Sequence, residues 1–287
     1  MPPQCPVCHH EIVKGAVACG ACGTRLQSPS GEPVVERPTR DDRGPGVTPW
    51  AVLRVVAVVI AVMACISILL PLLQHRRGHD VAYSKTQSKN NLKQIGLASH
   101  NYHDQYGNFP IGGTFDEEGR GLHSWQTRLL PFVDEQALYD GIDLQAAWND
   151  PVNSVPFAQV RGVYCNRSFP ELSQPVNGFA LSAYAGNSEV LRRNAGIAYR
   201  DIRDGTSHTL LAGEVSQGFK PWGDPTNVRN PADGVTGGPL GFGGPKRFPY
   251  LLFADGSVKS FSKDVSADVL KALATPAGGE PVDPNSY

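Results

Sequence analysis

The sequence has almost no net charge, because 26 lysine and arginine residues nearly balance 27 aspartate and glutamate residues. A chain without a strong positive field has no general means of holding a polyanion, so we expect no nucleic-acid partner. Common catalytic signatures are also missing: there is no phosphate-binding glycine loop, no G-x-S-x-G turn and no H-E-x-x-H helix. These absences predict a protein that is not an enzyme.

Cysteine is scarce beyond residue 22, where only two of the six occur. The other four read C-x2-C-x10-C-x2-C and are Cys5, Cys8, Cys19 and Cys22. Each two-residue gap lets one tight turn aim two thiolates at the same point, and two such turns complete a tetrahedral four-sulfur site. We therefore predict a small zinc ribbon at residues 1–26, with Zn²⁺ in a structural role. Two disulfides are the alternative that this spacing leaves open.

The predicted ribbon is too short to bury much apolar surface, so a bound metal would have to supply its folding energy. His9 and His10 follow the first cysteine pair, but four cysteines already fill the shell and we interpret both as surface residues. The segment resembles the short zinc ribbons at the N-termini of many bacterial membrane proteins. Its few basic residues, Lys14 and Arg25, argue against DNA as a ligand.

Long apolar runs are absent except for one. Residues 27–49 hold five prolines and three glycines and predict a flexible linker. Residues 50–73 follow, and 19 of them, from Val55 to Leu73, carry no charge. About 20 such residues cross a hydrocarbon core, so we predict a single-pass transmembrane helix at 50–73.

Because zinc thiolates survive best in a reducing compartment, we expect the ribbon in the cytoplasm and residues 74–287 outside the inner membrane.

The remaining sequence predicts a mixed α+β domain. Periodic apolar residues indicate helices at 81–106 and 124–139, the second interrupted by Pro131, and a short helix at 266–274. Short apolar runs at 160–165, 197–202 and 208–214 favour strands, and 250–262 favours a hairpin that turns at Asp255-Gly256. The glycine- and proline-rich segment 218–249 predicts a long irregular loop, and 276–287 a loose tail.

Four motifs occur in the order of a known bacterial family. They are NNLKQIGLASHNYHDQYGNFP (90–110), SWQTRLLPFVDEQALYD (124–140), DIRDGTSHTLLAGE (201–214) and FADGSVKSF (253–261). Together they resemble the family called domain of unknown function 1559, over roughly residues 70–280. The resemblance implies a prepilin- or pseudopilin-like fold, in which a long N-terminal helix leaves the membrane and packs on an antiparallel sheet.

The chain departs from that family in three places. No acidic residue occurs from Val47 to Gln74, and the glycine of the prepilin cleavage signature is missing, so processing by a prepilin peptidase is not expected. Pro245 stands where the family has a histidine before its Asp-Gly turn. Ser88 stands where family members often have a cysteine, which implies that Cys165 is an unpaired, buried thiol.

Three groups of polar residues are candidates for a metal or catalytic site, and each also has an ordinary structural explanation. The pair His100 and His103, with Asp104, suits either a metal or the exposed face of a helix. Ser207 and His208 are adjacent, so on a strand they would point to opposite faces and share no proton. Three acidic residues are candidates for calcium binding, namely Asp201, Asp204 and Glu214. They do not form the dense acidic loop that is typical of a calcium site.

The sequence therefore predicts a non-catalytic, membrane-anchored, pilin-like protein that acts in cell-envelope structure, assembly or secretion through protein–protein contacts. Its expected partners are the lipid bilayer and other pilin-like or envelope proteins. The alternative is a transmembrane sensor or regulator, whose zinc ribbon docks a cytoplasmic partner.

Overall fold

The computed structural model describes residues 2–26, 49–245, 248–283 and 286–287, without the side chains of 51 and 68–85. The predicted linker therefore lies, except for Pro49, outside the described residues. The chain divides into two compact units, Met1–Pro71 and Leu72–Tyr287, and each is described by itself.

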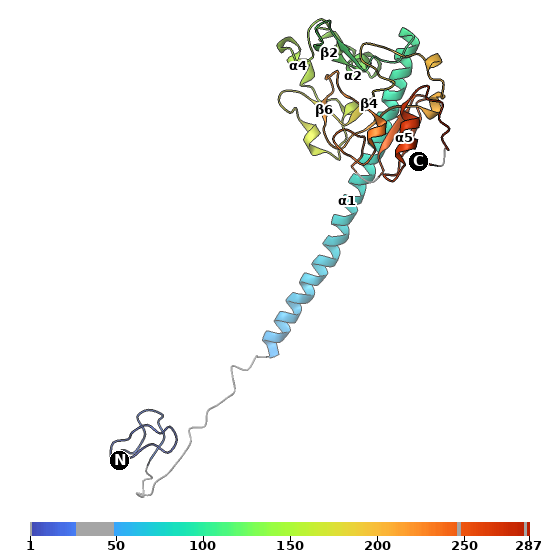
Figure 1. Ribbon diagram of the computed structural model, residues 1–287. Helices are drawn as coiled ribbons and strands as arrows, with labels where there is room; N and C mark the ends of the chain where they lie inside the picture. The colour runs from blue at the N-terminus through green and yellow to red at the C-terminus, as the bar shows by residue number, and fades with distance from the viewer. Residues whose placement is uncertain (1, 27–48, 246–247, 284–285) are drawn as a thin grey trace. The chain divides into compact units, whose positions relative to one another are not determined.

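The longest element is the helix α1, Pro49–Tyr106 (Figure 1). Among the described residues, no helix has the length and apolar character required of a membrane span. The span predicted at 50–73 includes residues whose side chains are not described, and it remains a prediction. Large apolar side chains in the described N-terminal part of α1 are exposed to solvent: Val52, Leu53, Val55, Val56, Val58, Val59, Ile60, Val62, Met63 and Ile66.

The C-terminal part of α1 belongs to the core of the second unit. Leu92, Ile95 and Ser99 are buried, as the periodicity predicts. At Gly96 the helix approaches strand β8 (Tyr250–Phe253) so closely that a Cβ atom would lie 2.9 Å from Leu252 Cδ1. This glycine is therefore needed for close helix–sheet packing rather than for a turn.

A five-stranded sheet lies against this helix and has the order β7-β4-β5-β8-β9. Its strands are β7 (Val228–Arg229), β4 (Tyr184–Asn187), β5 (Leu210–Glu214), β8 (Tyr250–Phe253) and β9 (Val258–Ser260). All neighbours are antiparallel except β4 and β7. The hairpin predicted at 250–262 is confirmed as β8 and β9, and Gly256 supplies the positive φ of its turn.

Two small two-stranded sheets and several short helices complete the unit. One sheet pairs β1 (Gly113–Phe115) with β2 (Gly121–Ser124), and the other pairs β3 (Leu181–Ser182) with β6 (Lys220–Pro221). The α-helices are α2 (Trp125–Leu129), α3 (Gln136–Asp140), α4 (Ser154–Phe157) and α5 (Ala267–Ala274). The 3-10 helices are Leu130–Phe132, Pro151–Asn153, Gly162–Tyr164, Pro170–Ser173, Tyr199–Asp201, Thr206–His208 and Pro231–Asp233.

The observed elements correct several predictions. The helix expected at 124–139 is divided at Pro131, as predicted, into α2, a 3-10 turn and α3. The strand expected at 208–214 is confirmed as β5. The strands expected at 160–165 and 197–202 are wrong, because both segments form 3-10 turns. A short apolar run has the same composition whether it enters the core as a strand or as a 3-10 turn, so composition alone does not distinguish the two.

The described part of the glycine-rich segment 218–249 is mostly irregular, as predicted, although it contains β6, β7 and the 3-10 helix Pro231–Asp233. One side chain of β7 organises it from within. Arg229 is buried, and burial lowers its pKa to about 10. Its guanidinium donates hydrogen bonds to four backbone carbonyls, those of Gln217, Gly218, Gly238 and Gly241, and so holds two irregular stretches of backbone together.

The expectation of a loose tail at 276–287 is wrong for the described part of that segment. The carboxylate of Asp204 accepts hydrogen bonds from the backbone N–H groups of Gly278 and Gly279. The ring of Tyr287 stacks on Phe261 at a centroid distance of 4.9 Å. These contacts join segments far apart in the sequence, which local composition does not reveal.

Candidate metal centre

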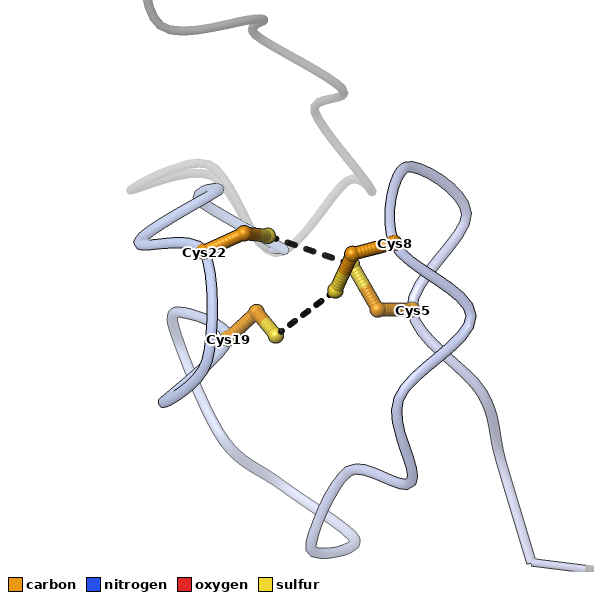
Figure 2. Close-up of side chains that lie close together, drawn as sticks. All are labelled: Cys5, Cys8, Cys19 and Cys22. Atoms are coloured by element: carbon orange, nitrogen blue, oxygen red, sulfur yellow. Dashed lines mark hydrogen bonds between the residues drawn. The ribbon is translucent and has the colours of Figure 1, made fainter.

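The four N-terminal cysteines converge on one point. Their sulfur atoms all lie within 4.8 Å of one another. Cys5 and Cys22 are 3.7 Å apart at their sulfurs, and Cys8 and Cys19 are 3.6 Å apart (Figure 2). A disulfide has an S–S length of about 2 Å, so both distances exclude one. A tetrahedral site with metal–sulfur bonds of about 2.3 Å places its sulfurs about 3.8 Å apart, which these positions match.

Two similar turns hold these cysteines. In the first, the Cys5 N–H bonds the His10 carbonyl, and the His9 N–H bonds the Cys5 carbonyl. In the second, the Cys19 N–H bonds the Thr24 carbonyl, and the Gly23 N–H bonds the Cys19 carbonyl.

The second turn repeats the first at an offset of 14 residues. Isolated bridges flank the turns at positions with the same offset, Gln4 with Glu11 and Ala18 with Arg25. The site is therefore built from two copies of one local structure. The sequence carries this signal as CPVCHHE and CGACGTR, which the spacing of the cysteines alone does not bring out.

The turns also set the charge of the sulfurs. The Thr24 hydroxyl lies 3.0 Å from the Cys22 sulfur and, with the Thr24 backbone N–H, lowers the pKa of that thiol to about 6. Backbone N–H groups of Cys8 and Val7 lower the pKa of Cys5. Hydrogen bonds to the charged form favour a thiolate, which is the form that binds metals.

Cys8 shows the limit of that effect. The His10 N–H lowers its pKa, but the nearby sulfurs of Cys22 and Cys19, together with burial, outweigh this and raise it to about 12. Four sulfurs this close cannot all ionise unless a cation lies among them. The donor set therefore fits a metal ion bound by four thiolates. In the described residues it is the one group of three or more histidine, cysteine, aspartate or glutamate side chains with this arrangement.

The histidine pair on α1 has a structural role. His100 Nε2 lies 2.8 Å from the Ala254 carbonyl oxygen, at the β8–β9 turn. His103 Nε2 accepts a hydrogen bond from the Tyr199 N–H at 3.2 Å. His100 packs edge-on against Phe109 and Tyr199, whereas His103 packs edge-on against Phe109 and in a tilted arrangement on Tyr199. Both side chains are therefore half-buried in these contacts, and do not lie on the exposed helix face that the sequence suggested.

The expectation for Ser207 and His208 is wrong in its geometry. The Ser207 hydroxyl lies 3.1 Å from His208 Nδ1, because residues 206–208 form a 3-10 turn and not a strand. Asp204, the nearby carboxylate that a hydrolase triad would require, instead accepts hydrogen bonds from the backbone N–H groups of Gly278 and Gly279. The three side chains therefore do not have the arrangement of a hydrolase triad.

The three acidic candidates have separate roles. Asp201 accepts the N–H of Ala198 at a turn, and Asp204 caps residues 278–279. Glu214, which is 2% exposed, joins α1 to the sheet. Its carboxylate accepts hydrogen bonds from Ser88, Asn166 and the Tyr250 N–H.

Taken together, the fold and the site define an α+β domain that contains the end of a long helix, preceded by a four-cysteine centre. A family model described as a protein of unknown function (DUF1559) matches residues 85–185. The match extends from the C-terminal part of α1 into β4, and it confirms the resemblance to that family. No curated protein and no solved structure shows significant similarity to the chain.

Proposed function

We propose that this chain is a non-catalytic, membrane-anchored, pilin-like protein that acts in the cell envelope through protein–protein contacts. The observation that carries this proposal is the two-part character of α1. Its N-terminal part exposes large apolar side chains within an uncharged run from Val55 to Ile66, which water solvates poorly. Its C-terminal part supplies buried side chains to a folded domain. One helix that is first lipid-compatible and then core-forming suits an anchor for that domain.

The four-cysteine centre is proposed to hold structural Zn²⁺. Zinc accepts four thiolates in a tetrahedral shell, and a closed shell of this kind leaves no position for a substrate. Bound Zn²⁺ would supply the energy that folds residues 1–26. We place this ribbon in the cytoplasm, where thiols stay reduced, and the C-terminal domain outside the inner membrane.

Edge strand β9 is the proposed contact surface of the domain. It pairs only with β8 in the five-stranded sheet, and its residues are partly or fully exposed. An unpaired strand edge is suited to adding a strand from a partner. The glycine-rich segment 218–249 is less available for contact, because many of its described residues are buried and Arg229 anchors it internally.

Membrane fractionation tests the anchor. A Val58→Lys/Val59→Lys variant places two charges in the middle of the apolar stretch, and we expect the protein to move from the alkaline-resistant membrane pellet to the soluble fraction. Val152→Lys/Val155→Lys, at exposed valines of the domain, is the matched control and should stay in the pellet. Equal pelleting of both variants would contradict the anchor.

One observation supports the sensor alternative. The ribbon exposes Val7, Val13 and Val17, and Val13 is 81% exposed. Apolar side chains on so small a unit offer a contact for a cytoplasmic protein. Crosslinking from position 13 of the full chain in cells distinguishes the alternatives. A specific crosslinked cytoplasmic protein that is lost in Val13→Asp favours the sensor, and its absence favours the anchored envelope role.

A further inference from the structure

An open groove of about 510 Å³ lies on the surface of the C-terminal domain. Its apolar lining comes from two segments: Ala137 and Leu138 belong to α3, and Val152 and Val155 belong to the 3-10 helix Pro151–Asn153 and to α4. Val152 is 57% exposed and Val155 is 73% exposed. Large apolar side chains that are exposed together in a concave surface are typical of a site that a partner covers.

The polar side chains in the lining bind one another and fix the shape of the groove. Arg161 Nη1 donates to Glu135 Oε2 at 2.9 Å, and its Nη2 donates to Gln159 Oε1 at 3.1 Å. These bonds join the residue before α3 to the residues after α4, so the two segments that form the groove are held together. The charges of Glu135 and Arg161 also neutralise each other, and a preformed groove costs a partner little ordering.

The segments that form the groove carry excess negative charge. Between residues 134 and 161, the only basic residue is Arg161, and the five acidic residues are Asp134, Glu135, Asp140, Asp143 and Asp150. Glu135 is bound by Arg161, and the ion pairs among the described residues include none of the other four. Three of those four are exposed, at positions 134, 140 and 143. The groove therefore attracts a cationic partner and repels an anionic one.

We propose that this groove docks a protein segment in which basic side chains flank a short apolar stretch. The apolar stretch covers Val152 and Val155, and the basic side chains face the carboxylates of Asp134 and Asp140. The groove includes no residue of β9, so it is a second contact surface of the domain. This inference does not depend on the anchor or on the zinc ribbon.

Three fluorescein-labelled peptides separate the two requirements: KLLKLLK is basic and apolar, ELLELLE is acidic and apolar, and KSSKSSK is basic and polar. Fluorescence anisotropy measures their binding to the full chain in micelles of an uncharged detergent, with empty micelles as the blank. We expect saturable binding of KLLKLLK that weakens as salt is added, and at least tenfold weaker binding of the other two. A lack of saturable binding by KLLKLLK, or equal binding by either other peptide, would overturn the proposal.

A first pair of variants tests the apolar lining. Val152→Ser/Val155→Ser removes exposed hydrocarbon from the groove, and we expect it to weaken the binding of KLLKLLK at least tenfold. Val13→Ser/Val17→Ser makes the same change at exposed valines of the ribbon and should bind the peptide as the unmodified chain does. Equal binding by the two variants would place the peptide elsewhere and contradict the site.

A second pair tests the charge. In Asp134→Asn/Asp140→Asn, asparagine tolerates the φ of 62° at position 134 and keeps an acceptor for the Gln136 amide at position 140. We expect at least threefold weaker binding of KLLKLLK and a shallower dependence on salt. Glu117→Gln/Glu118→Gln, at exposed carboxylates outside the groove, should change neither. An unchanged salt dependence in the aspartate variant contradicts the proposed recognition.

Discussion

The ribbon and the C-terminal domain reach a defined fold by different means. The ribbon buries Cys5, Cys19 and Thr24, and its large apolar residues Val13 and Val17 are exposed. The domain buries large side chains that include Trp125, Trp222, Tyr164, Tyr184 and Phe109. In the function proposed above, the first depends on ligand geometry around a metal; the second depends on an apolar core. A change that damages one should therefore leave the other intact.

Loss of a metal ligand should have the largest effect. We expect Cys19→Ser to unfold the ribbon, because structural zinc contributes about 10–16 kcal/mol to such peptides and three thiolates hold it far less tightly. Metal analysis of the purified chain should show loss of about one zinc per chain, with the melting temperature of the C-terminal domain unchanged. Cys65→Ser, at a cysteine outside the cluster, should retain the metal.

Truncation of a core side chain should destabilise the C-terminal domain and leave the ribbon unaffected. Trp125 is fully buried, and its indole N–H donates to the Asn227 carbonyl at 2.9 Å. We expect Trp125→Ala to lower the free energy of unfolding of the domain by about 3–5 kcal/mol, measured by denaturant titration, without loss of zinc. Trp50→Ala, at a tryptophan that is 76% exposed, should leave domain stability unchanged. Zinc loss in Trp125→Ala would show that the two units depend on each other.

Acidification should weaken the domain through His123. Its ring is fully buried, neither ring nitrogen has a hydrogen-bond partner among the described residues, and burial, followed by the charge of Arg128, lowers its pKa to about 4. The unfolded chain, with a pKa of about 6.5, binds the proton first, so stability falls as the pH drops from about 6.5 toward 4.

That difference in pKa corresponds to about 3 kcal/mol. Replacement of His123 by Phe should flatten this part of the stability–pH curve, measured by denaturation at several pH values, whereas His10→Gln in the ribbon should not change it. An unchanged slope in the His123→Phe variant would contradict the assignment.

The smallest expected effect comes from a change that makes the two halves of the ribbon more alike. His9 has φ 60° and Gly23, its counterpart, has φ 71°. The left-handed conformation costs a non-glycine residue about 1–2 kcal/mol, and a glycine at this position avoids that cost. Part of the gain is lost because glycine gives the unfolded chain more conformational freedom. We expect His9→Gly to tighten zinc binding slightly, by at most about fivefold in a competition titration with a chelator. A marked loss of zinc would instead identify His9 as a ligand.

Local patterns in the sequence predicted much of this structure. The cysteine cluster, the helical character of 81–106 and the hairpin at Asp255-Gly256 follow from spacing, periodicity and turn chemistry. The helix ends at Tyr106 as predicted, but it does not begin at 81, because α1 is continuous from Pro49. The family resemblance was likewise confirmed over residues 85–185.

The contacts that were missed join distant segments. Arg229 resembles an ordinary surface residue in its own loop, and only the folded chain brings carbonyls 217, 218, 238 and 241 to it. A cavity lined by Gln87 and by residues between Val160 and Ser173 likewise needs α1 and that segment together. Short apolar runs such as 160–165 contain too few residues to show a period, so the sequence does not distinguish a strand from a 3-10 turn there.

Hydrogen exchange on the full chain in micelles, before and after removal of metal by a chelator, tests the separation of the two units most directly. We expect the backbone N–H groups of Cys5, Cys19 and Gly23 to lose protection when the metal is removed, while those of β5 and β8 keep theirs. Protection that persists in the ribbon without metal, or that is lost in both units together, would contradict the claim that a metal holds the ribbon and an apolar core holds the domain.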